Sequence, residues 1–306
     1  MKKVLITGVN GLLGQKLVHL LDKDEQYNVL ATARGESRLP SGSAVEYSSL
    51  DVTDEKSVKA LIHSYNPDVV IHTAAMTNVD ACEDEEQACD LLNVQSVRFI
   101  AEALAGSSAQ IIHISTDFIF DGLNGPYDED AEANALSVYG QSKLDSEKVL
   151  EQSGVHYCIL RTILVYGILP DLSRSNFILW SKSNLEKNKS INVVDDQFRS
   201  PTLAEDLAMA CKLAMDKKAQ GVFNVSGPET FSILELVKMV ADHWKLDQSL
   251  IGTVTTAELG QKAHRPARTG FILDKAIAEL SFKPTSFKVS LDLIEQQLNH
   301  VNQTSK

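Results

Sequence analysis

The chain of 306 residues is 43% apolar and 23% charged, and its 29 basic and 41 acidic side chains give a formal net charge of −12. These values predict a globular protein with a sizeable core, in one large domain or two moderate ones, and the acidic balance argues against a nucleic-acid partner. The sequence has no signal-peptide pattern, no apolar run of membrane-spanning length and no paired C-x-x-C cysteines, so we expect a cytoplasmic protein without a membrane partner.

The chain begins with a strand, glycine turn and helix pattern that is typical of a phosphate site. The apolar run Val4-Leu5-Ile6 leads into Thr7-Gly-Val-Asn-Gly-Leu-Leu-Gly14, and a helical pattern of leucines follows. We expect Gly8 to permit the tight turn, Gly11 to admit a pyrophosphate and Gly14 to let the helix pack close to the sheet. The predicted phosphate contacts of a dinucleotide cofactor are therefore Gly8, Asn10, Gly11, Leu12, Leu13 and Gly14. A plain loop is the alternative, because the first glycine gap is one residue longer than in the common fingerprint.

The end of the second predicted strand, residues 27–33, indicates which dinucleotide binds. A carboxylate there would accept hydrogen bonds from the adenosine ribose, but the chain instead has Arg34, with Arg38 nearby. A guanidinium at this place could hold a 2′-phosphate, so NADP(H) is favoured and NAD(H) is the alternative. The competing interpretation is that Arg34 is an ordinary surface cation beside Glu36.

Strands and helices alternate along the first half of the chain. Further strands are predicted at 45–50, 68–73 and 110–115, and a helix at 55–65 is stopped by Asn66-Pro67. Strands that are apolar on both faces predict a parallel sheet covered by helices on each side, an α/β, Rossmann-like doubly wound fold. Ligands of such sheets bind beyond the carboxyl ends of the strands. At those ends the predicted cofactor contacts are Asp51, Val52, Ala74, Ala75 and Thr77.

Three residues beyond the phosphate site are candidates for chemistry. Thr116 follows the predicted strand 110–115 and puts a hydroxyl at the sheet edge, although a helix cap would look the same. Tyr139 and Lys143 have the spacing i and i+4 in a helical stretch, so their side chains share one helix face. An ammonium beside a phenol lowers a phenol pKa of about 10, which makes Tyr139 a candidate general acid. Taken alone, such a pair is usually a core-edge aromatic beside a solvated amine.

Together these features resemble the extended short-chain dehydrogenase/reductase superfamily. The exact residues of the motifs resemble its dTDP-4-dehydrorhamnose reductase branch. The matching segments run in order along most of the chain: His72-Thr-Ala-Ala75, Val79-Asp80, Ser115-Thr-Asp-Phe-Ile-Phe-Asp-Gly122, Tyr139-Gly-Gln-Ser-Lys-Leu144, Val165-Tyr-Gly167, Ser200-Pro-Thr202 and Arg265-Pro266. The resemblance implies an NAD(P)H-dependent reductase of a nucleotide-linked 4-keto-6-deoxysugar, as in dTDP-rhamnose biosynthesis.

The resemblance also implies roles for individual residues. Tyr139 would protonate the forming alkoxide, and Lys143 would lower the phenol pKa and hold the nicotinamide ribose. Thr116 would hydrogen-bond the substrate oxygen, and Asp117 would contact a sugar hydroxyl. We place Arg199 and Arg265 near the substrate diphosphate, with ordinary ion pairing as the alternative. No metal site is expected.

Four departures from the branch fall on the substrate side. Phe118 replaces a tyrosine, Leu164 replaces a tryptophan, Arg199 stands near the Pro-Thr motif where a glycine is common, and Ala267–Gly270 replaces an Asn-Ser pair. The sugar and its nucleotide therefore stay open.

The strand and helix rhythm breaks after Gly167, which sets the predicted domain organisation. Residues 1–167 are the expected NAD(P)-binding domain, and by resemblance 203–226 return to its sheet. Segments 168–202 and 227–306 form a discontinuous substrate-binding lobe. His72, His113 and His243 have no partner spacing and are interpreted as structural.

Two rival functions stay open beside the reductase. An epimerase or dehydratase of the same fold would keep its cofactor bound and return the hydride. A non-catalytic NADP-binding regulatory subunit, resembling that of methionine adenosyltransferase, would use the same residues only to hold the cofactor. The expected partner is a nucleotide sugar, and a homodimer is one candidate assembly.

Overall fold

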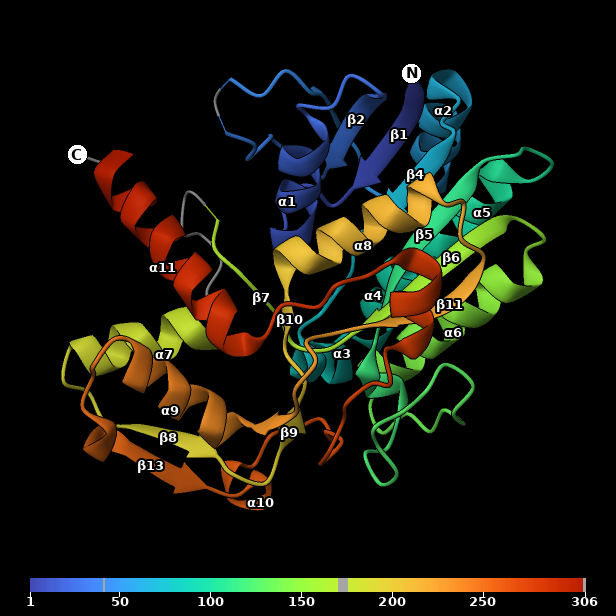
Figure 1. Cartoon of the computed structure of the whole chain (residues 1–306). Helices are drawn as coiled ribbons and strands as arrows, with labels where there is room; N and C mark the ends of the chain where they lie inside the picture. Colours follow the sequence, from blue (N-terminus) through green and yellow to red (C-terminus); the bar gives the residue numbers. More distant parts are fainter. Residues whose placement is uncertain (41, 170–175, 305–306) are drawn as a thin grey trace.

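Seven parallel strands form the central sheet of the computed structural model, which describes residues 1–40, 42–169 and 176–304 (Figure 1). Their order is β11-β6-β5-β4-β1-β2-β3. The strands are β1 (Lys2–Thr7), β2 (Tyr27–Ala33), β3 (Glu46–Ser49), β4 (Val69–His72), β5 (Gln110–Thr116), β6 (His156–Thr162) and β11 (Gly221–Val225). The order reverses direction between β1 and β4, the arrangement in which ligands bind beyond the strand ends. The Rossmann-like α/β prediction is confirmed.

Helices cover both faces of this sheet. Successive side chains of each strand point to opposite faces, and because both sets are apolar here, each face needs a covering layer. Val4 and Ile6 of β1 pack in the core that includes α1 (Leu12–Leu21) and α8 (Ala204–Asp216). Leu5, between them, packs in the opposite core, with α2 (Glu55–Tyr65), α5 (Ser96–Leu104) and α6 (Val138–Gln152). The continuous apolar strands of the sequence are therefore explained by burial on both sides.

The predicted helix at 55–65 shows how local sequence sets an element's limits. Asp54 caps the start of α2 by accepting a hydrogen bond from the Lys56 backbone N–H at 3.1 Å. Asn66 ends the helix in the left-handed conformation, with φ +51°, and Pro67 follows. The predicted limits of this helix are confirmed.

The chain leaves the sheet after β6 and returns to it. The short strand β7 (Val165–Tyr166) pairs with β10 (Thr202–Leu203), which leads directly into α8, and β11 then pairs in parallel with β6 at the edge of the sheet. A second lobe, at lower left in Figure 1, is built from the segments on either side of this return.

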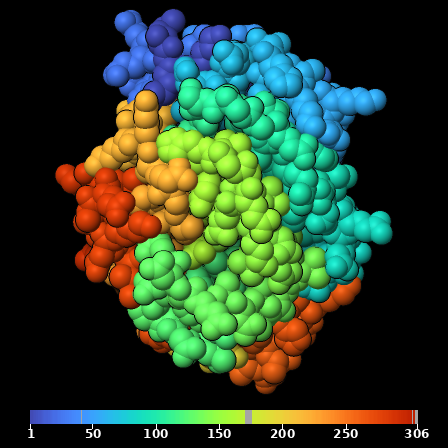
Figure 2. Space-filling model, turned by 90° about the vertical axis from the view of Figure 1, so that its right-hand side faces the viewer, coloured from blue at the N-terminus to red at the C-terminus, as the bar shows by residue number. Residues whose placement is uncertain are grey.

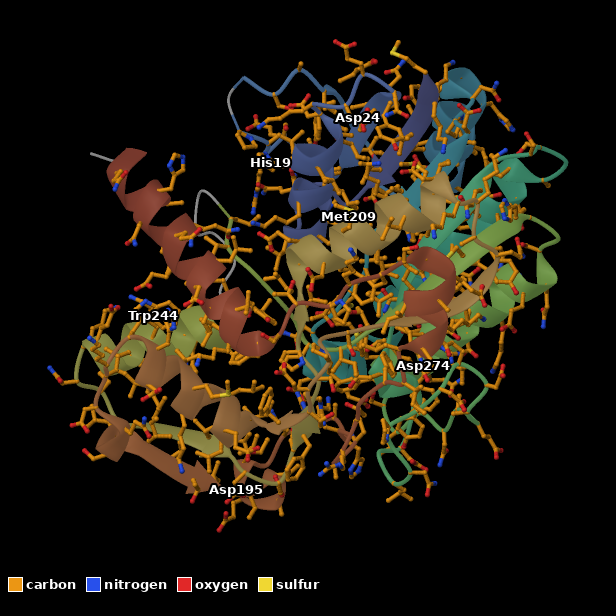
Figure 3. All side chains as sticks on the ribbon, in the orientation of Figure 1. His19, Asp24, Asp195, Met209, Trp244 and Asp274 are labelled. Atoms are coloured by element: carbon orange, nitrogen blue, oxygen red, sulfur yellow. The ribbon has the colours of Figure 1, made fainter. Side chains whose placement is uncertain are left out.

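The second lobe packs helices against a small sheet of its own. It contains α7 (Phe177–Glu186), α9 (Ile233–His243), and the parallel pair β8 (Ile191–Val194) and β13 (Ile251–Val254). The helix α11 (Phe287–Thr304) runs from this lobe along the sheet domain, where Gln297 donates to Glu205 of α8 at 2.6 Å. Figure 3 labels Met209 on α8 and Trp244 just after α9, one in each part of the molecule.

Short elements complete the described chain. They are α3 (Val79–Asp84), α4 (Glu86–Asp90), η1 (Leu91–Gln95), η2 (Asp117–Ile119), β9 (Phe198–Arg199), β12 (Phe231–Ser232), η3 (Gln248–Leu250), α10 (Thr256–Leu259) and η4 (Ala276–Leu280). The loop 120–135, green in Figure 2, lies beside residues near the C-terminal end of the chain, which are red there. The Tyr127 N–H donates to Gly270 O at 2.8 Å. None of the helices in the described ranges is long and apolar enough to cross a membrane.

Candidate active site

A cavity of about 650 Å³ opens at the carboxyl ends of β1, β4 and β5. Its wall comes from the glycine turn, the segment after β4, the end of β5, α6 and the second lobe. This is the size of a small-molecule site, at the place where doubly wound sheets bind ligands.

The glycine turn forms one end of this cavity, and its geometry fits the phosphates of a dinucleotide. Gly8 has φ +73°, and a side chain there would lie 2.6 Å from the backbone N of Ala74. Gly11 is the N-cap of α1 and provides no side-chain cap, and Leu12, Leu13 and Gly14 line the cavity. Uncapped N–H groups and the positive end of the helix dipole are the donors that an anionic ligand needs.

Asn10 has a supporting position behind this turn. Its amide oxygen accepts from the Arg38 N–H and its amide nitrogen donates to Glu36 O, both at 2.8 Å. The loop that carries Arg34 is thereby tied to the phosphate end.

Not every predicted cofactor residue lines the cavity. Ala74, Ala75 and Thr77 do, whereas the cavity wall does not include Gly8, Asn10, Arg34, Asp51 or Val52. The Asp51 carboxylate accepts from the hydroxyl and N–H of Thr53, at 2.7 and 3.0 Å, and these bonds hold the pKa of Asp51 below its ordinary value. The contact of this outer set with a cofactor stays a prediction.

The structure brings Thr116, Tyr139 and Lys143 to the same cavity. The close packing of α6 on η2 explains how, because a side chain at Gly140 would collide with the backbone oxygen of Phe118. The Phe118 ring meets the Tyr139 ring edge-on, with centroids 5.7 Å apart. Phe118, one of the four departures, thus packs against the candidate acid.

Burial dominates the electrostatics of these side chains. Tyr139 is 9% exposed, and burial raises the pKa of its phenol, while an interaction with the Thr116 hydroxyl lowers it by less. Burial also lowers the pKa of Lys143 to about 8, against the charge of Glu147. The Lys143 amine lies 3.0 Å from His113 Nε2. The prediction that the Tyr139 pKa lies below its usual value is therefore wrong for this structure, because burial outweighs the neighbouring groups.

The Asp117 carboxylate accepts hydrogen bonds from two threonines, one of which is Thr116. The Thr116 hydroxyl donates to Asp117 Oδ1 at 3.1 Å, and Thr269 Oγ1 donates to Oδ2 at 2.5 Å. Burial raises the pKa of Asp117, and the Arg199 guanidinium, 3.8 Å away, opposes that rise. Asp117 therefore orients Thr116, and Thr269 is a contributor that sequence reasoning missed.

The two predicted substrate cations line the cavity but already have partners. Arg199 donates to Pro266 O and Phe198 O, each at 2.7 Å. Arg265 donates to both carboxylate oxygens of Asp80, at 2.7 and 3.2 Å. Ordinary ion pairing was the alternative for both cations, and Arg265 does form an ion pair, but the identity of these partners was not predicted.

The whole chain was compared with known protein families once this geometry was established. Residues 1–300 match the family model described as RmlD substrate binding domain. The chain belongs to this family. The expected relation to the dTDP-4-dehydrorhamnose reductase branch is thereby confirmed.

Relatives of this RmlD-family chain include a reductase and a methionine adenosyltransferase subunit. It is 31% identical over 304 residues to dTDP-4-dehydrorhamnose reductase of Aggregatibacter actinomycetemcomitans, covering 95% of this chain and 97% of that protein. It is 34% identical over 265 residues to methionine adenosyltransferase 2 subunit beta of Xenopus laevis, covering 85% and 77%. Among solved structures, dTDP-4-dehydrorhamnose reductase from Bacillus anthracis, in complex with NADP, matches with a TM-score of 0.85 and 27% identity, over 97% of this chain and 100% of that one.

Proposed function

We propose that the protein is an NADPH-dependent reductase of a nucleotide-linked 4-keto-6-deoxysugar, with dTDP-4-dehydrorhamnose as the first candidate substrate. The observation that carries this proposal is the convergence of Thr116, Tyr139 and Lys143 on one cavity, whose other end is the uncapped start of α1. The reductase relative and the NADP-bound reductase structure, which both match along nearly all of this chain, support it.

The residues supply a proton and hold the substrate for a hydride transfer. NADPH held by the glycine turn and Lys143 would supply a hydride to the carbonyl carbon, and Tyr139 would donate its phenolic proton to the carbonyl oxygen, so that a keto group becomes an alcohol. A raised pKa keeps this phenol protonated at neutral pH. Thr116 would hydrogen-bond the same oxygen by turning its hydroxyl from Asp117. Positioned acid catalysis of this kind contributes about a hundredfold to ten-thousandfold.

We assign the preference for NADP(H) to Arg34. The second strand ends without a carboxylate that could accept from a ribose hydroxyl, and Asn10 ties the Arg34 loop to the phosphate end. NAD(H) binding stays the alternative.

We assign the sugar nucleotide to the lobe of residues 168–202 and 227–306, of which 170–175 and 305–306 lie outside the described residues. Arg199 and Arg265 face the cavity from this lobe. Arg265 would offer a phosphate oxygen the N–H groups that its bonds to Asp80 and to Ala263 O leave unused.

A second candidate function is that of a non-catalytic regulatory subunit, which the relative from Xenopus laevis favours. In that role the cavity would hold the cofactor as a structural ligand, and the protein would bind a partner enzyme. The catalytic residues would then be dispensable for function.

The decisive experiment is an assay of net cofactor consumption. The purified protein is mixed with NADPH and a panel of dTDP-, UDP- and GDP-linked 4-keto-6-deoxysugars, and cofactor absorbance is followed while products are identified. Consumption of one NADPH per sugar reduced supports the reductase. Sugar conversion without net consumption would identify an epimerase or dehydratase. Cofactor binding without any conversion would favour the regulatory subunit.

A further inference from the structure

His113 lies on the inner strand β5 and contacts the side chain of Lys143 on α6. His113 is 1% exposed, and its Nε2 is 3.0 Å from the Lys143 amine. Within the described residues, no other hydrogen-bond partner of this amine is found. A buried ammonium without an acceptor would be strongly destabilised, so His113 satisfies the main requirement of this charge.

We propose that His113 is a positioning residue, whose neutral imidazole accepts a hydrogen bond from Lys143 and fixes the amine at the floor of the cavity. The proposal rests on the proposed function in one respect: Lys143 takes part in catalysis only if the protein is an enzyme of hydride transfer, such as the proposed reductase, and not a regulatory subunit. The contact itself is independent of any reaction.

The surroundings of His113 explain why it acts as an acceptor. Burial and the charge of Lys143 both hold the pKa of His113 well below its ordinary value, so the ring is neutral. The Ser146 hydroxyl, 2.9 Å from Nε2, donates its own hydrogen to Lys143 O at 2.6 Å. Ser146 can therefore only accept from this ring, whereas a charged Lys143 needs the lone pair of Nε2.

One imidazole can serve both charge states of Lys143 by changing its tautomer. With a charged lysine, Nδ1 carries the hydrogen and Nε2 accepts. With a neutral amine, Nε2 carries the hydrogen and donates to Ser146 or to Lys143. Nδ1 has no partner among the described residues, so with a charged lysine its N–H is a buried donor without an acceptor, a cost that the hydrogen bond from Lys143 has to outweigh.

Other groups facing Lys143 act through charge alone. Glu147, one turn along α6, raises the pKa of Lys143, and it is itself paired with Arg161 of β6 at 2.7 Å. Cys89 of α4 also favours the ammonium. On the neighbouring strand β4, His72 stacks on His113 with ring centroids 5.7 Å apart.

His72 provides a matched control. It is as deeply buried as His113 and neighbours it in the strand register, but its ring bonds to Thr7 at 2.8 Å and to Ser96 at 3.2 Å. His72→Leu should therefore disturb packing as much as His113→Leu does, without removing the acceptor of Lys143. His113→Gln keeps an acceptor near the position of Nε2, and the shorter His113→Asn does not reach it.

The first measurement is the titration of Lys143, followed by NMR on protein labelled at lysine Cε, with the resonance assigned by its absence in Lys143→Arg. We expect His113→Leu to lower the pKa of Lys143 from about 8 by roughly one unit, because the ammonium loses its acceptor. His113→Gln should restore most of the wild-type value, and His72→Leu should leave it unchanged.

The second measurement is turnover against pH. We expect His113→Leu to lower kcat by roughly tenfold to a hundredfold, with the KM for the sugar nucleotide nearly unchanged. The alkaline limb of the pH profile should move to lower pH, because Lys143 loses its proton at lower pH. Equal Lys143 titration in wild type and His113→Leu, or a kcat loss that His113→Gln does not reverse, would overturn the proposal. If His113→Leu does not fold, the comparison of His113→Gln with His113→Asn decides in the same way. The titration needs no substrate, so a protein without reductase activity whose Lys143 still responds to His113 would count against the proposed function and not against this contact.

Discussion

Asp80 and Arg265 form a two-point ion pair between the sheet domain and the second lobe. Arg265 Nη2 lies 2.7 Å from Asp80 Oδ2, and Nη1 lies 3.2 Å from Oδ1, across 185 positions of sequence. The same carboxylate accepts from the Ala263 N–H at 3.0 Å, and these partners, Arg265 first, hold the pKa of Asp80 below its ordinary value. The pair fixes Arg265 at the cavity wall before any substrate arrives.

We predict that Asp80→Asn raises KM for the sugar nucleotide roughly three- to tenfold with little change in kcat, because Arg265 loses its fixed orientation. Steady-state kinetics with the substrate found in the panel assay measure this. Asp84→Asn is the control, since Asp84 lies one turn further on α3 and pairs with the exposed Lys262. Equal KM values for the two variants would show that the ion pair does not prepare a substrate cation.

Tyr139→Phe should keep NADPH affinity and lose turnover by about a hundredfold to ten-thousandfold, because the phenyl ring fills the same space without a proton to donate. Lys143→Ala should lose both, since the amine is assigned to the cofactor ribose as well. Fluorescence titration gives the affinities, and the absorbance assay gives turnover. Tyr157→Phe, on β6 and outside the cavity wall, serves as the control. Unimpaired turnover in Tyr139→Phe would remove it as the acid.

The parts of the site that sequence predicted are those encoded over short distances. The glycine turn, the i and i+4 spacing of Tyr139 and Lys143, and the strand rhythm are local patterns, and all reappear in the structure. The contacts of Lys143 with His113, Asp117 with Thr269 and Asp80 with Arg265 join residues 30, 152 and 185 positions apart. Such pairs depend on how whole elements pack, and no spacing rule indicates them. The raised pKa of Tyr139 was missed for the same reason, because burial is a property of the assembled core.

Arg34→Ala should weaken NADPH binding roughly tenfold and leave NADH binding nearly unchanged, because only the 2′-phosphate meets the guanidinium. The exposed position of Arg34, beyond the end of β2, means that its removal should not disturb the fold. Dissociation constants for both cofactors are compared by fluorescence titration. Arg98→Ala on α5, where the exposed side chain donates to Gln95 at 3.2 Å, controls for the loss of a surface charge. An unchanged ratio of the two constants would exclude Arg34 from the cofactor site.

Glu147→Gln should destabilise the protein by about 3–5 kcal/mol, because it leaves the Arg161 charge buried without its counterion. The two side chains are 2% and 7% exposed, and Arg161 Nη2 lies 2.7 Å from Glu147 Oε2. Urea unfolding gives the change in the free energy of unfolding. Lys59→Met, which breaks the exposed pairs with Glu55 and Glu102, should cost far less, because solvent screens exposed charges. Similar losses of unfolding free energy in both variants would show that the buried pair stabilises the fold no more than the surface pairs do.

Lys143→Met should stabilise the fold at neutral pH by up to about 3 kcal/mol while abolishing turnover, because an amine whose pKa falls from 10.5 to about 8 on folding opposes folding when it is charged. The sign follows from proton uptake: between pH 8 and 10.5 the unfolded chain binds a proton that the folded protein has released, so the wild type gains stability as pH rises through this window. The advantage of Lys143→Met is therefore full below the folded pKa and fades as pH approaches the unfolded one. Free energies of unfolding of the two proteins, measured across this range and subtracted, cancel the titration of all other groups. Lys59→Met should show a flat difference. Parallel curves for the wild type and Lys143→Met would mean that the buried amine carries no folding penalty. Burial would then not be the cause of a lowered Lys143 pKa.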